Sequence, residues 1–255
     1  MKELIKSQLE RVGLLNPARA LRRQAKRGWH NAQTSLGFTP HRPMENRRYW
    51  ENRGQVYAGQ FLSDLTPEDP YTHAQQDFLR ELRRLEWDSV LEVGCGFGWH
   101  LRAIREQYPH KRIAGIDFSC SQLRQGTDYL RGRRVFMGQA DASRLPFADD
   151  AFDLVFTSGT LACIHADLLP DVLREIHRVT RRSVILLEYA REHIESTARK
   201  EQMEEAEWHG HLYRDALVNT GLQLVKAFSF QSFSSHPDRV PLSFFYAEKE
   251  AHGKS

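Results

Sequence analysis

The sequence has few cysteines and no long hydrophobic run. Its 255 residues include three widely spaced cysteines, Cys95, Cys120 and Cys163, and no C-x-x-C pair. This pattern argues against a zinc or redox motif and against a disulfide framework. No stretch approaches the roughly 18 uninterrupted apolar residues of a membrane span, and the Leu4-Ile5 start is too brief for a signal-peptide core. We therefore expect a cytoplasmic protein with reduced thiols.

Positive charge is concentrated at the start of the chain. The first 50 residues hold 11 Lys and Arg against 3 Asp and Glu, whereas the remainder holds 25 against 30. Such asymmetry indicates a basic appendage that meets an anionic partner. We assign residues 1–43 to a helical extension and linker, because Gly37, Pro40 and Pro43 interrupt the helical pattern. One domain, residues 44–255, follows it.

The partner of this basic extension is open between three readings. An anionic membrane surface is favoured, because Leu21, Ala25 and Trp29 would form the apolar side of an interfacial helix, with the protein held peripherally at the inner face of the membrane. Nucleic acid phosphates also need only positive charge. Nucleic acid ranks second because no RNA-binding motif accompanies the arginines and the domain is acidic. A solvated helical arm is the third reading.

Strands and helices alternate through the domain. Two helices are expected first, over residues 49–62 and 72–85. The predicted strands cover residues 89–93, 112–117, 135–139, 152–157, 184–188, 222–230 and 242–248. The predicted helices between them cover residues 99–108, 121–129, 168–179, 191–207 and 212–220. This alternation predicts an α/β fold with a mostly parallel sheet and helices on both faces.

A glycine-rich run follows the first predicted strand of the core. Glycines occupy alternate positions at Gly94, Gly96 and Gly98, and a helix begins at once. Glycines let the backbone turn sharply and approach a ligand closely. The dinucleotide motif G-x-G-x-x-G would need glycine where this chain has Trp99, which disfavours nicotinamide and flavin cofactors.

Acidic residues stand at the ends of the next two predicted strands. Asp117 ends the second strand and can accept both hydroxyls of a ribose, as acids at this position do in dinucleotide folds. Asp141 follows the third strand. A strand-end aspartate is also a common helix cap or turn former. Because open α/β sheets bind ligands beyond the strand ends, we favour a binding role for both.

Taken together, Glu92-x-Gly94-x-Gly96-x-Gly98, Asp117, Asp141-Ala142 and Phe152-Asp153-Leu154-Val155 resemble motifs of the class I methyltransferases that use S-adenosylmethionine (SAM). The resemblance covers about residues 72–248. It implies a Rossmann-like sheet of seven strands with the last one antiparallel, SAM as cofactor, and S-adenosylhomocysteine as product. The cofactor-binding residues that it implies are Glu92, Gly94, Cys95, Gly96, Gly98, Asp117, Phe118, Asp141, Ala142 and Ser158.

The same resemblance implies a role for each part of this set. The glycine loop would lie against the methionine half of SAM and Asp117 would hold the ribose. Phe118 would pack on the adenine, and Asp141 with Ala142 would contact its edge. Residues 44–86 would form a helical lid over the cofactor, with its aromatic side chains at Tyr49, Trp50 and Tyr57.

Methyl transfer from a sulfonium is a displacement in which positioning alone can supply much of the rate. A base matters when the acceptor is a hydroxyl or a protonated amine. The candidate catalytic residues are His165, Glu188, His209 and His211. Each also has a structural alternative. His165 is then a polar residue that starts a helix, Glu188 is a carboxylate with a buried structural partner, and His209 and His211 are surface histidines. No third ligand supports a metal site at the pair.

Segments around Glu188-Tyr189 and Trp208-His209-Gly210-His211 are similar to methylases associated with pseudaminic (nonulosonic) acid and glycan biosynthesis, although Ala190 replaces the second tyrosine of that subgroup. The resemblance implies an O or N atom of a small molecule or glycan as acceptor, with a sugar or glycan precursor first. An RNA methyltransferase is the alternative, weakened by the lack of an Asn-Pro-Pro-Tyr segment after the fourth strand. A non-catalytic SAM-binding partner subunit is the third reading.

Overall fold

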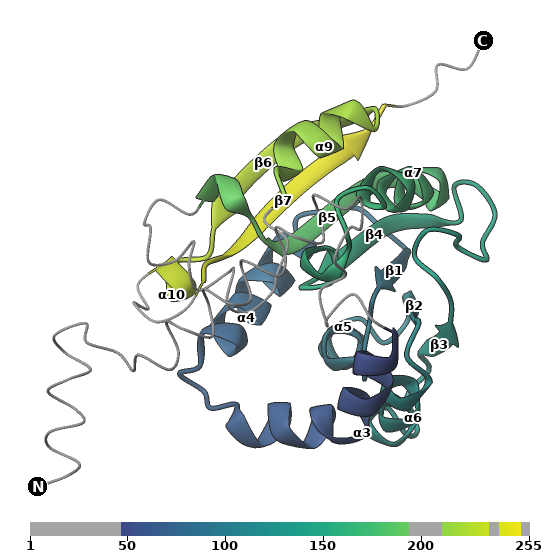
Figure 1. Cartoon of the computed structure of the whole chain (residues 1–255), viewed down its shortest axis with the longest axis vertical. Coiled ribbons are helices and arrows are strands. Elements are labelled where there is room, and N and C mark those ends of the chain that lie inside the picture. Colours follow the sequence, from purple (N-terminus) through teal and green to yellow (C-terminus); the bar gives the residue numbers. More distant parts are fainter. Residues whose placement is uncertain (1–46, 194–210, 235–239, 251–255) are drawn as a thin grey trace, which may run out of the picture. The chain divides into compact units, whose positions relative to one another are not determined.

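The computed structural model describes residues 47–193, 211–234 and 240–250. Two helices, α3 (Arg47–Asp64) and α4 (Pro70–Leu82), precede the core. The strands of the core are β1 (Ser89–Val93), β2 (Arg112–Asp117), β3 (Phe136–Gln139), β4 (Phe152–Ser158), β5 (Thr180–Tyr189), β6 (Leu222–Ser229) and β7 (Leu242–Lys249). Its α-helices are α5 (Trp99–Gln107), α6 (Cys120–Tyr129), α7 (Leu169–Val179), α9 (Tyr213–Asn219) and α10 (Gln231–Ser234) (Figure 1).

The seven strands form one sheet in the order β3-β2-β1-β4-β5-β7-β6. Strands β1 to β5 are mutually parallel where they pair, whereas β7 runs antiparallel to both β5 and β6. This confirms the predicted Rossmann-like architecture with an antiparallel last strand. The order reverses between β1 and β4, which is the switch point where sheets of this kind bind ligands.

Two hydrophobic layers cover the two faces of the sheet. Phe78 of α4, Leu101 of α5 and Phe156 of β4 belong to one layer, and Leu173 of α7 and Leu217 of α9 belong to the other. All five side chains are at most 1% exposed. Burial of each such side chain stabilises the fold by about 1.5–3 kcal/mol. The helices therefore hold the strand ends, where the candidate site lies, in fixed positions.

Strand β5 is longer than its sequence indicates. It begins at Thr180, four residues before the predicted start, and Arg181 and Arg182 are exposed. Arg181 donates to Asp153 Oδ1 at 2.8 Å, which holds this end of β5 against β4. Charged residues at the start of a buried strand interrupt its apolar run. The apolar pattern therefore predicted only the second half of β5.

The two edges of the sheet are β3 and β6. Strand β3 has four residues, and its Phe136 is 58% exposed. In β6 the pairing with β7 shifts register between Leu224 and Lys226, and Val225 is exposed. A shift of this kind is a β-bulge, which bends an edge strand and leaves one residue outside the ladder.

Two predicted segments fall partly or wholly outside the described residues. The basic extension, residues 1–43, lies outside them, as does most of the predicted helix over residues 191–207. Its first residues form a short 3-10 helix, η3 (Arg191–His193). Among the helices of the described segments, none combines the length and hydrophobicity that crossing a membrane requires.

Candidate functional site

The glycine loop joins β1 to α5. Gly94, Gly96 and Gly98 all have positive φ, at 79°, 53° and 83°. A side chain at Gly94 would also collide with that of Thr160, so both the backbone conformation and the space require glycine there. The amides of Gly94 and Cys95 both donate to the carbonyl of Ile116 in β2, at 2.8 and 2.9 Å. The loop is therefore fixed to the neighbouring strand.

Asp117 ties the end of β2 to the same loop. Its Oδ2 accepts a hydrogen bond from the Gly96 amide, and its Oδ1 accepts one from the Ser119 amide, both at 2.8 Å. Burial raises the pKa of this carboxyl group, while the amides of Ser119 and Gly96 oppose the shift. Each carboxylate oxygen can accept a second hydrogen bond. Asp117 can thus shape the loop and receive ligand hydroxyls together.

Glu92 lies in β1, two residues before Gly94 of the loop, and its role at the cofactor stays a prediction. Its side chain is 2% exposed, and its Oε2 is buried without a hydrogen-bond partner among the described residues. Burial raises the pKa of Glu92 well above its ordinary value, and Asp117 adds to the shift. A buried oxygen without a donor is costly. The site therefore fits a ligand that brings hydrogen-bond donors to this region.

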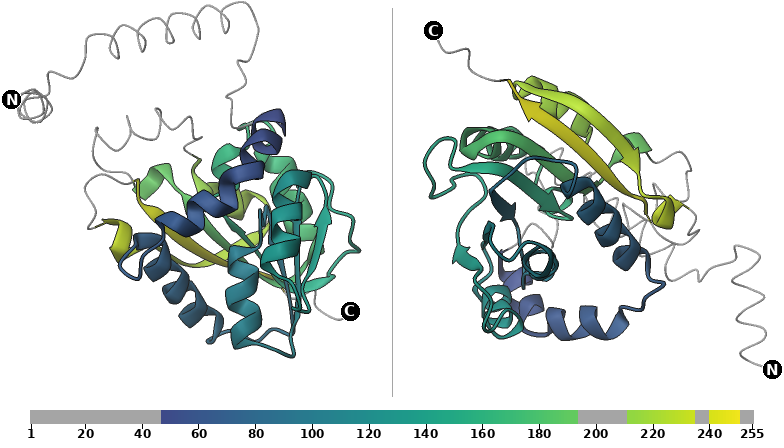
Figure 2. Two further views of the ribbon diagram at one scale, coloured as in Figure 1. Left: turned by 90° about the horizontal axis from the view of Figure 1, so that it is seen from below. Right: turned by 180° about the vertical axis from the view of Figure 1, so that it is seen from behind.

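Helix α3 lies across the N-terminus of α6 (Figure 2). Both oxygens of Glu51 accept from the first amides of α6, those of Cys120 and Ser121, at 2.8 and 3.0 Å. A carboxylate at a helix N-terminus is favourable because the first amides lack partners within the helix. This contact, which the sequence analysis missed, places α3 beside Asp117. Glu51 is one of several acids on or near α3, and no sequence pattern sets it apart.

The aromatic side chains of α3 extend this contact to the glycine loop. The Tyr57 ring lies 6.1 Å from that of Trp50, 5.8 Å from that of Phe61 and 6.1 Å from that of Phe97 in the loop. Burial raises the pKa of Tyr57 to about 12, so its phenol stays protonated near neutral pH. Tyr49 packs edge-on against Trp50. This arrangement is consistent with the predicted lid.

The predicted adenine contacts lie at the ends of β2 and β3. Phe118 is half-buried, and its carbonyl accepts from Gln139 Nε2 at 2.9 Å. Asp141 is exposed, and its Oδ1 accepts from the amide and the hydroxyl of Ser143 at 2.9 and 2.7 Å. These bonds make Asp141 a turn former, and the half-buried Ala142 follows it. The adenine role stays a prediction for all three.

Glu188 ends β5 and is fully buried. It accepts hydrogen bonds from the amides of Thr160, Leu161 and Ala162 at 3.0, 3.1 and 3.3 Å, which are the first amides of the 3-10 helix η2 (Leu161–Cys163). Burial raises its pKa to about 7, although these amides oppose the shift. Backbone amides are thus the buried structural partner considered from the sequence. A catalytic role for Glu188 stays a prediction.

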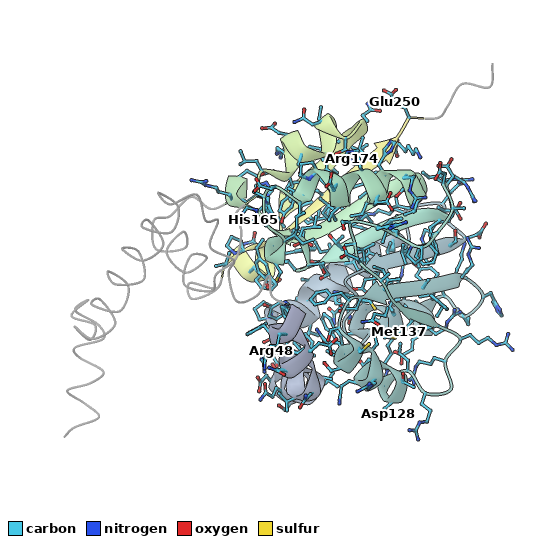
Figure 3. All side chains as sticks on the ribbon, turned by 45° about the vertical axis from the view of Figure 1, so that its right-hand side comes forward. Arg48, Asp128, Met137, His165, Arg174 and Glu250 are labelled. Carbon is cyan, nitrogen blue, oxygen red and sulfur yellow. The ribbon has the colours of Figure 1, made fainter. Side chains whose placement is uncertain are left out.

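Two of the three candidate histidines, His165 and His211, lie in the described structure, and both are at the segment that follows β4. His211 is buried, and its Nε2 lies 3.1 Å from the Leu161 carbonyl and 2.9 Å from the Ile164 carbonyl. Carbonyl oxygens only accept, so Nε2 donates and fixes the segment after β4. His165 lies between β4 and α7, with its Nδ1 3.2 Å from Asp167 Oδ2 (Figure 3). His209 lies outside the described residues. A base role stays a prediction for each of them.

His100 is a second residue beside the predicted site that the sequence analysis missed. It lies in the first turn of α5 and is 8% exposed. Its Nε2 is 3.0 Å from Ser158 Oγ at the end of β4, and its Nδ1 is 3.4 Å from Gln75 Nε2 on α4. Burial lowers its pKa to about 3. The sequence does carry a signal for His100. The helical period assigns its position, next to Leu101 and before Ile104, to the buried face of the helix.

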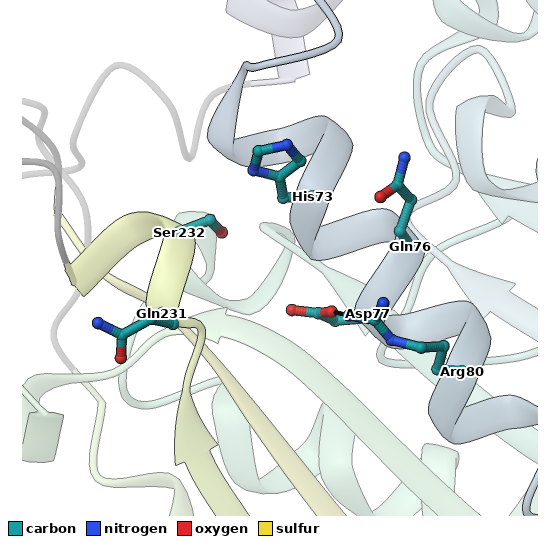
Figure 4. Close-up of a pocket in the computed structure, with 6 residues that line it drawn as sticks. All are labelled: His73, Gln76, Asp77, Arg80, Gln231 and Ser232. Atoms are coloured by element: carbon teal, nitrogen blue, oxygen red, sulfur yellow. Dashed lines mark ion pairs between the residues drawn. The ribbon is translucent and has the colours of Figure 1, made fainter.

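A separate pocket lies between α4 and α10 (Figure 4). It encloses about 360 Å³ and is lined by polar side chains, namely His73, Gln76, Asp77, Arg80, Gln231 and Ser232. Asp77 and Arg80 form an ion pair with each other. None of the predicted cofactor-binding or catalytic residues lines this pocket, so it is distinct from the candidate site at the strand ends.

Comparison with known proteins agrees with this geometry. Residues 90–183, which include the glycine loop, Asp117, Asp141 and Ser158, match the family model described as methyltransferase domain. This segment is thus similar to methyltransferase domains. Two solved structures share the fold at low sequence identity. One is a chain of a Haloferax volcanii complex that contains the Trm112 methyltransferase activator, with a TM-score of 0.61, 17% identity, and 78% of this chain and 96% of that chain covered. The other is geranyl diphosphate C-methyltransferase from Streptomyces coelicolor, with a TM-score of 0.56 and 14% identity. The match covers 69% of this chain and 78% of that chain.

Curated proteins match this chain over shorter stretches than the two solved structures do. Demethylmenaquinone methyltransferase of Roseiflexus sp. (strain RS-1) is 36% identical over 104 residues, 40% of this chain and 43% of its own. Malonyl-[acyl-carrier protein] O-methyltransferase of Legionella pneumophila is 37% identical over 92 residues, 35% of this chain and 31% of its own. The chain thus spans less than half the length of these relatives.

Proposed function

We propose that the protein is a SAM-dependent methyltransferase that moves a methyl group to an O or N atom of a small-molecule or glycan acceptor. The observation that carries the proposal is the coupling of Asp117 to the glycine loop through the Gly96 amide, at the switch point of the sheet. The match of residues 90–183 to methyltransferase domains supports it. The Streptomyces coelicolor enzyme of this fold was solved with S-adenosylhomocysteine bound, which supports the choice of cofactor.

The residues present fit this cofactor. Asp117 would receive the ribose hydroxyls, and the loop from Gly94 to Gly98 would lie along the amino-acid half. The unpaired Glu92 oxygen would favour a cationic or hydrogen-bond-donating group above the loop. When bound, SAM supplies the electrophilic methyl group. The chain's part is to hold the two reactants in line and to exclude water, for which α3 and its aromatic side chains provide the cover.

The acceptor is proposed at the level of its class. The resemblance of Glu188-Tyr189 and the segment around His211 to glycan-pathway methylases puts a sugar or glycan precursor first. The named activities of the curated relatives add demethylmenaquinone and malonyl-acyl carrier protein to the acceptors for a screen. RNA belongs in the same screen because of the basic residues 1–43. Binding of SAM without turnover of any acceptor would favour the non-catalytic partner subunit.

Calorimetric titration with SAM and S-adenosylhomocysteine tests the cofactor site. We expect micromolar binding by the wild type and its loss in Asp117→Ala, with Asp117→Asn intermediate because it keeps part of the contact with Gly96. Asp128→Asn is the matched control, since Asp128 lies at the far end of α6 and pairs with Arg131 on the surface (Figure 3). Equal effects of the Asp117 and Asp128 substitutions, or no binding by the wild type, would contradict the proposal.

A further inference from the structure

Gln75, His100 and Ser158 form a chain of hydrogen bonds that leads from α4 through α5 to the end of β4. The Gln75 amide nitrogen lies 3.5 Å from the Trp99 carbonyl and 3.4 Å from His100 Nδ1. His100 Nε2 lies 3.0 Å from Ser158 Oγ. The imidazole packs edge-on against Phe78 and Phe156. It is therefore a buried polar group in an apolar wall, with both ring nitrogens engaged.

The direction of these bonds follows from the Trp99 carbonyl. A carbonyl only accepts, so the Gln75 side chain must present its NH₂ group, not its oxygen, to this corner. The same NH₂ group then donates to His100 Nδ1, which must accept. Because burial lowers the pKa of His100 to about 3, the ring is neutral and carries its one proton on Nε2. His100 thus donates to Ser158 Oγ.

This bond leaves the Ser158 hydroxyl proton available. A serine hydroxyl has one proton to donate, and His100 already fills one of its acceptor positions. Within the described residues the hydroxyl makes this one hydrogen bond, and Ser158 is partly exposed at the end of β4. A fixed hydrogen-bond donor at this strand end suits an oxygen atom that only accepts hydrogen bonds, such as a carboxylate oxygen.

The sheet order places this donor at one end of the proposed cofactor. Asp117 ends β2, the glycine loop follows β1, and Ser158 ends β4, next to Thr157, which pairs with Val93. Neighbouring strands are about 4.8 Å apart, so the ends of β2 and β4 are about 10 Å apart. A nucleoside cofactor with its ribose at Asp117 must cross the loop to reach Ser158. In SAM, the group beyond the ribose and the sulfur is an amino acid.

We propose that His100, held by Gln75, is a positioning residue that makes the Ser158 hydroxyl a fixed hydrogen-bond donor to the carboxylate at the amino-acid end of the cofactor. The inference rests on the proposed function and deepens it. Ser158 was expected at the cofactor from the sequence, whereas the part of the cofactor that it contacts, and the roles of His100 and Gln75, come from the geometry.

Two ligands that differ in the amino-acid group test this proposal by calorimetry. S-adenosylhomocysteine carries the group, and 5′-methylthioadenosine, which shares the nucleoside and the sulfur, lacks it. Ser158→Ala should weaken the first by about tenfold, as expected for a hydrogen bond to a charged group, and change the second by less than twofold. His100→Leu should give the same pattern. His100→Gln, whose amide nitrogen can take the place of Nε2, should restore the affinity to within about threefold of the wild type.

Controls separate this role from a merely structural one. Ser183→Ala changes a buried serine near the opposite end of β5 and should leave both affinities unchanged. Equal weakening of both ligands by His100→Leu, or unchanged S-adenosylhomocysteine binding by Ser158→Ala, would overturn the inference while leaving the proposed function intact. A wild type that binds neither ligand would instead overturn the proposed function, and the inference with it.

The tautomer of His100 gives a second, independent test. Nitrogen-15 NMR of the histidine side chains, with His100 assigned by comparison with His100→Gln, should show a neutral ring protonated on Nε2 from pH 5 to pH 8. A proton on Nδ1, or an imidazolium within this range, would reverse the direction of the bond to Ser158 or add a charge, and either result would overturn the proposal.

Discussion

The hydroxyl groups of Tyr71 and Tyr189 lie 2.5 Å apart and join the start of α4 to the end of β5. Burial raises the pKa of Tyr189 well above its ordinary value, so its phenol is neutral near neutral pH. The Tyr71 ring also packs edge-on against Phe61 of α3 and Phe233 of α10. This pair therefore connects the segment before the core to the strand that carries Glu188.

A double-mutant cycle on this pair should reveal its contribution. Tyr71→Phe and Tyr189→Phe each remove the same hydrogen bond, so each should lower the free energy of unfolding by about 1 kcal/mol. The double variant should lose less than the sum of the two, with a coupling energy of about 1 kcal/mol. Urea denaturation of the four proteins measures it. Strictly additive losses would show that the hydroxyl contact contributes nothing to stability.

Two glycines of α3 make a matched test of how closely this helix packs. A Cβ at Gly54 would collide with the Ser121 hydroxyl and lie 2.9 Å from the Gln122 amide nitrogen, whereas a Cβ at Gly59 would meet nothing within 4 Å. Gly54→Ala should therefore destabilise the protein by about 1–3 kcal/mol. Gly59→Ala should stabilise it by up to about 1 kcal/mol, because alanine favours helix. Thermal and urea unfolding measure the change in the free energy of unfolding of both variants. No change in Gly54→Ala would mean that α3 does not pack on α6.

The carboxylate of Glu51 should keep α3 docked. Glu51→Ala removes the acceptor for the first amides of α6, a loss of about 1 kcal/mol for a cap of this kind. Hydrogen exchange of the amides in residues 47–64 should accelerate severalfold. Asn52→Ala, an exposed neighbour on the same helix, is the control and should leave the exchange unchanged. The same protection in both variants would show that the aromatic contacts alone hold α3.

Glu188 should make stability depend on pH in a direction opposite to that of most acids. Its pKa rises from 4.5 to about 7 on folding, so the folded protein binds more protons between these values than the unfolded chain does. The stability of the wild type relative to Glu188→Gln should therefore be greatest near pH 4.5 and fall by about 2–3 kcal/mol as the pH rises to 7. Urea denaturation of both proteins at several pH values measures this difference. A difference that stays constant with pH would contradict the raised pKa.

The sequence predicts the framework of the site because local patterns determine it. Glycine at positions 94, 96 and 98 and the acid at 117 are set by backbone conformation and strand ends, both of which are local in the chain. The prediction placed Glu92, Gly96 and Asp117 at one group of strand ends, and the hydrogen bond from the Gly96 amide to Asp117 joins two of these three residues.

What the sequence does not predict depends on contacts between distant segments. Glu51 reaches Cys120 and Ser121 across about 70 positions, and Glu188 reaches Thr160 across 28. Neither pairing has a spacing rule. Arg181 and Arg182 interrupt the apolar run at the start of β5, and their ion pairs with Asp153 and Glu86 form only between segments that folding brings together.

The bulge at Val225 and the brevity of β3 bear on how the protein behaves at high concentration. An open sheet offers unpaired backbone groups along both of its outer strands, and such strands recruit copies of the chain into aggregates. Here one border is only four residues long and the other is bent where its register shifts, so neither offers a long, flat template. Deleting Val225 should straighten β6. We therefore expect this deletion to lower the solubility of the protein more than it affects binding at the ends of β1, β2 and β4.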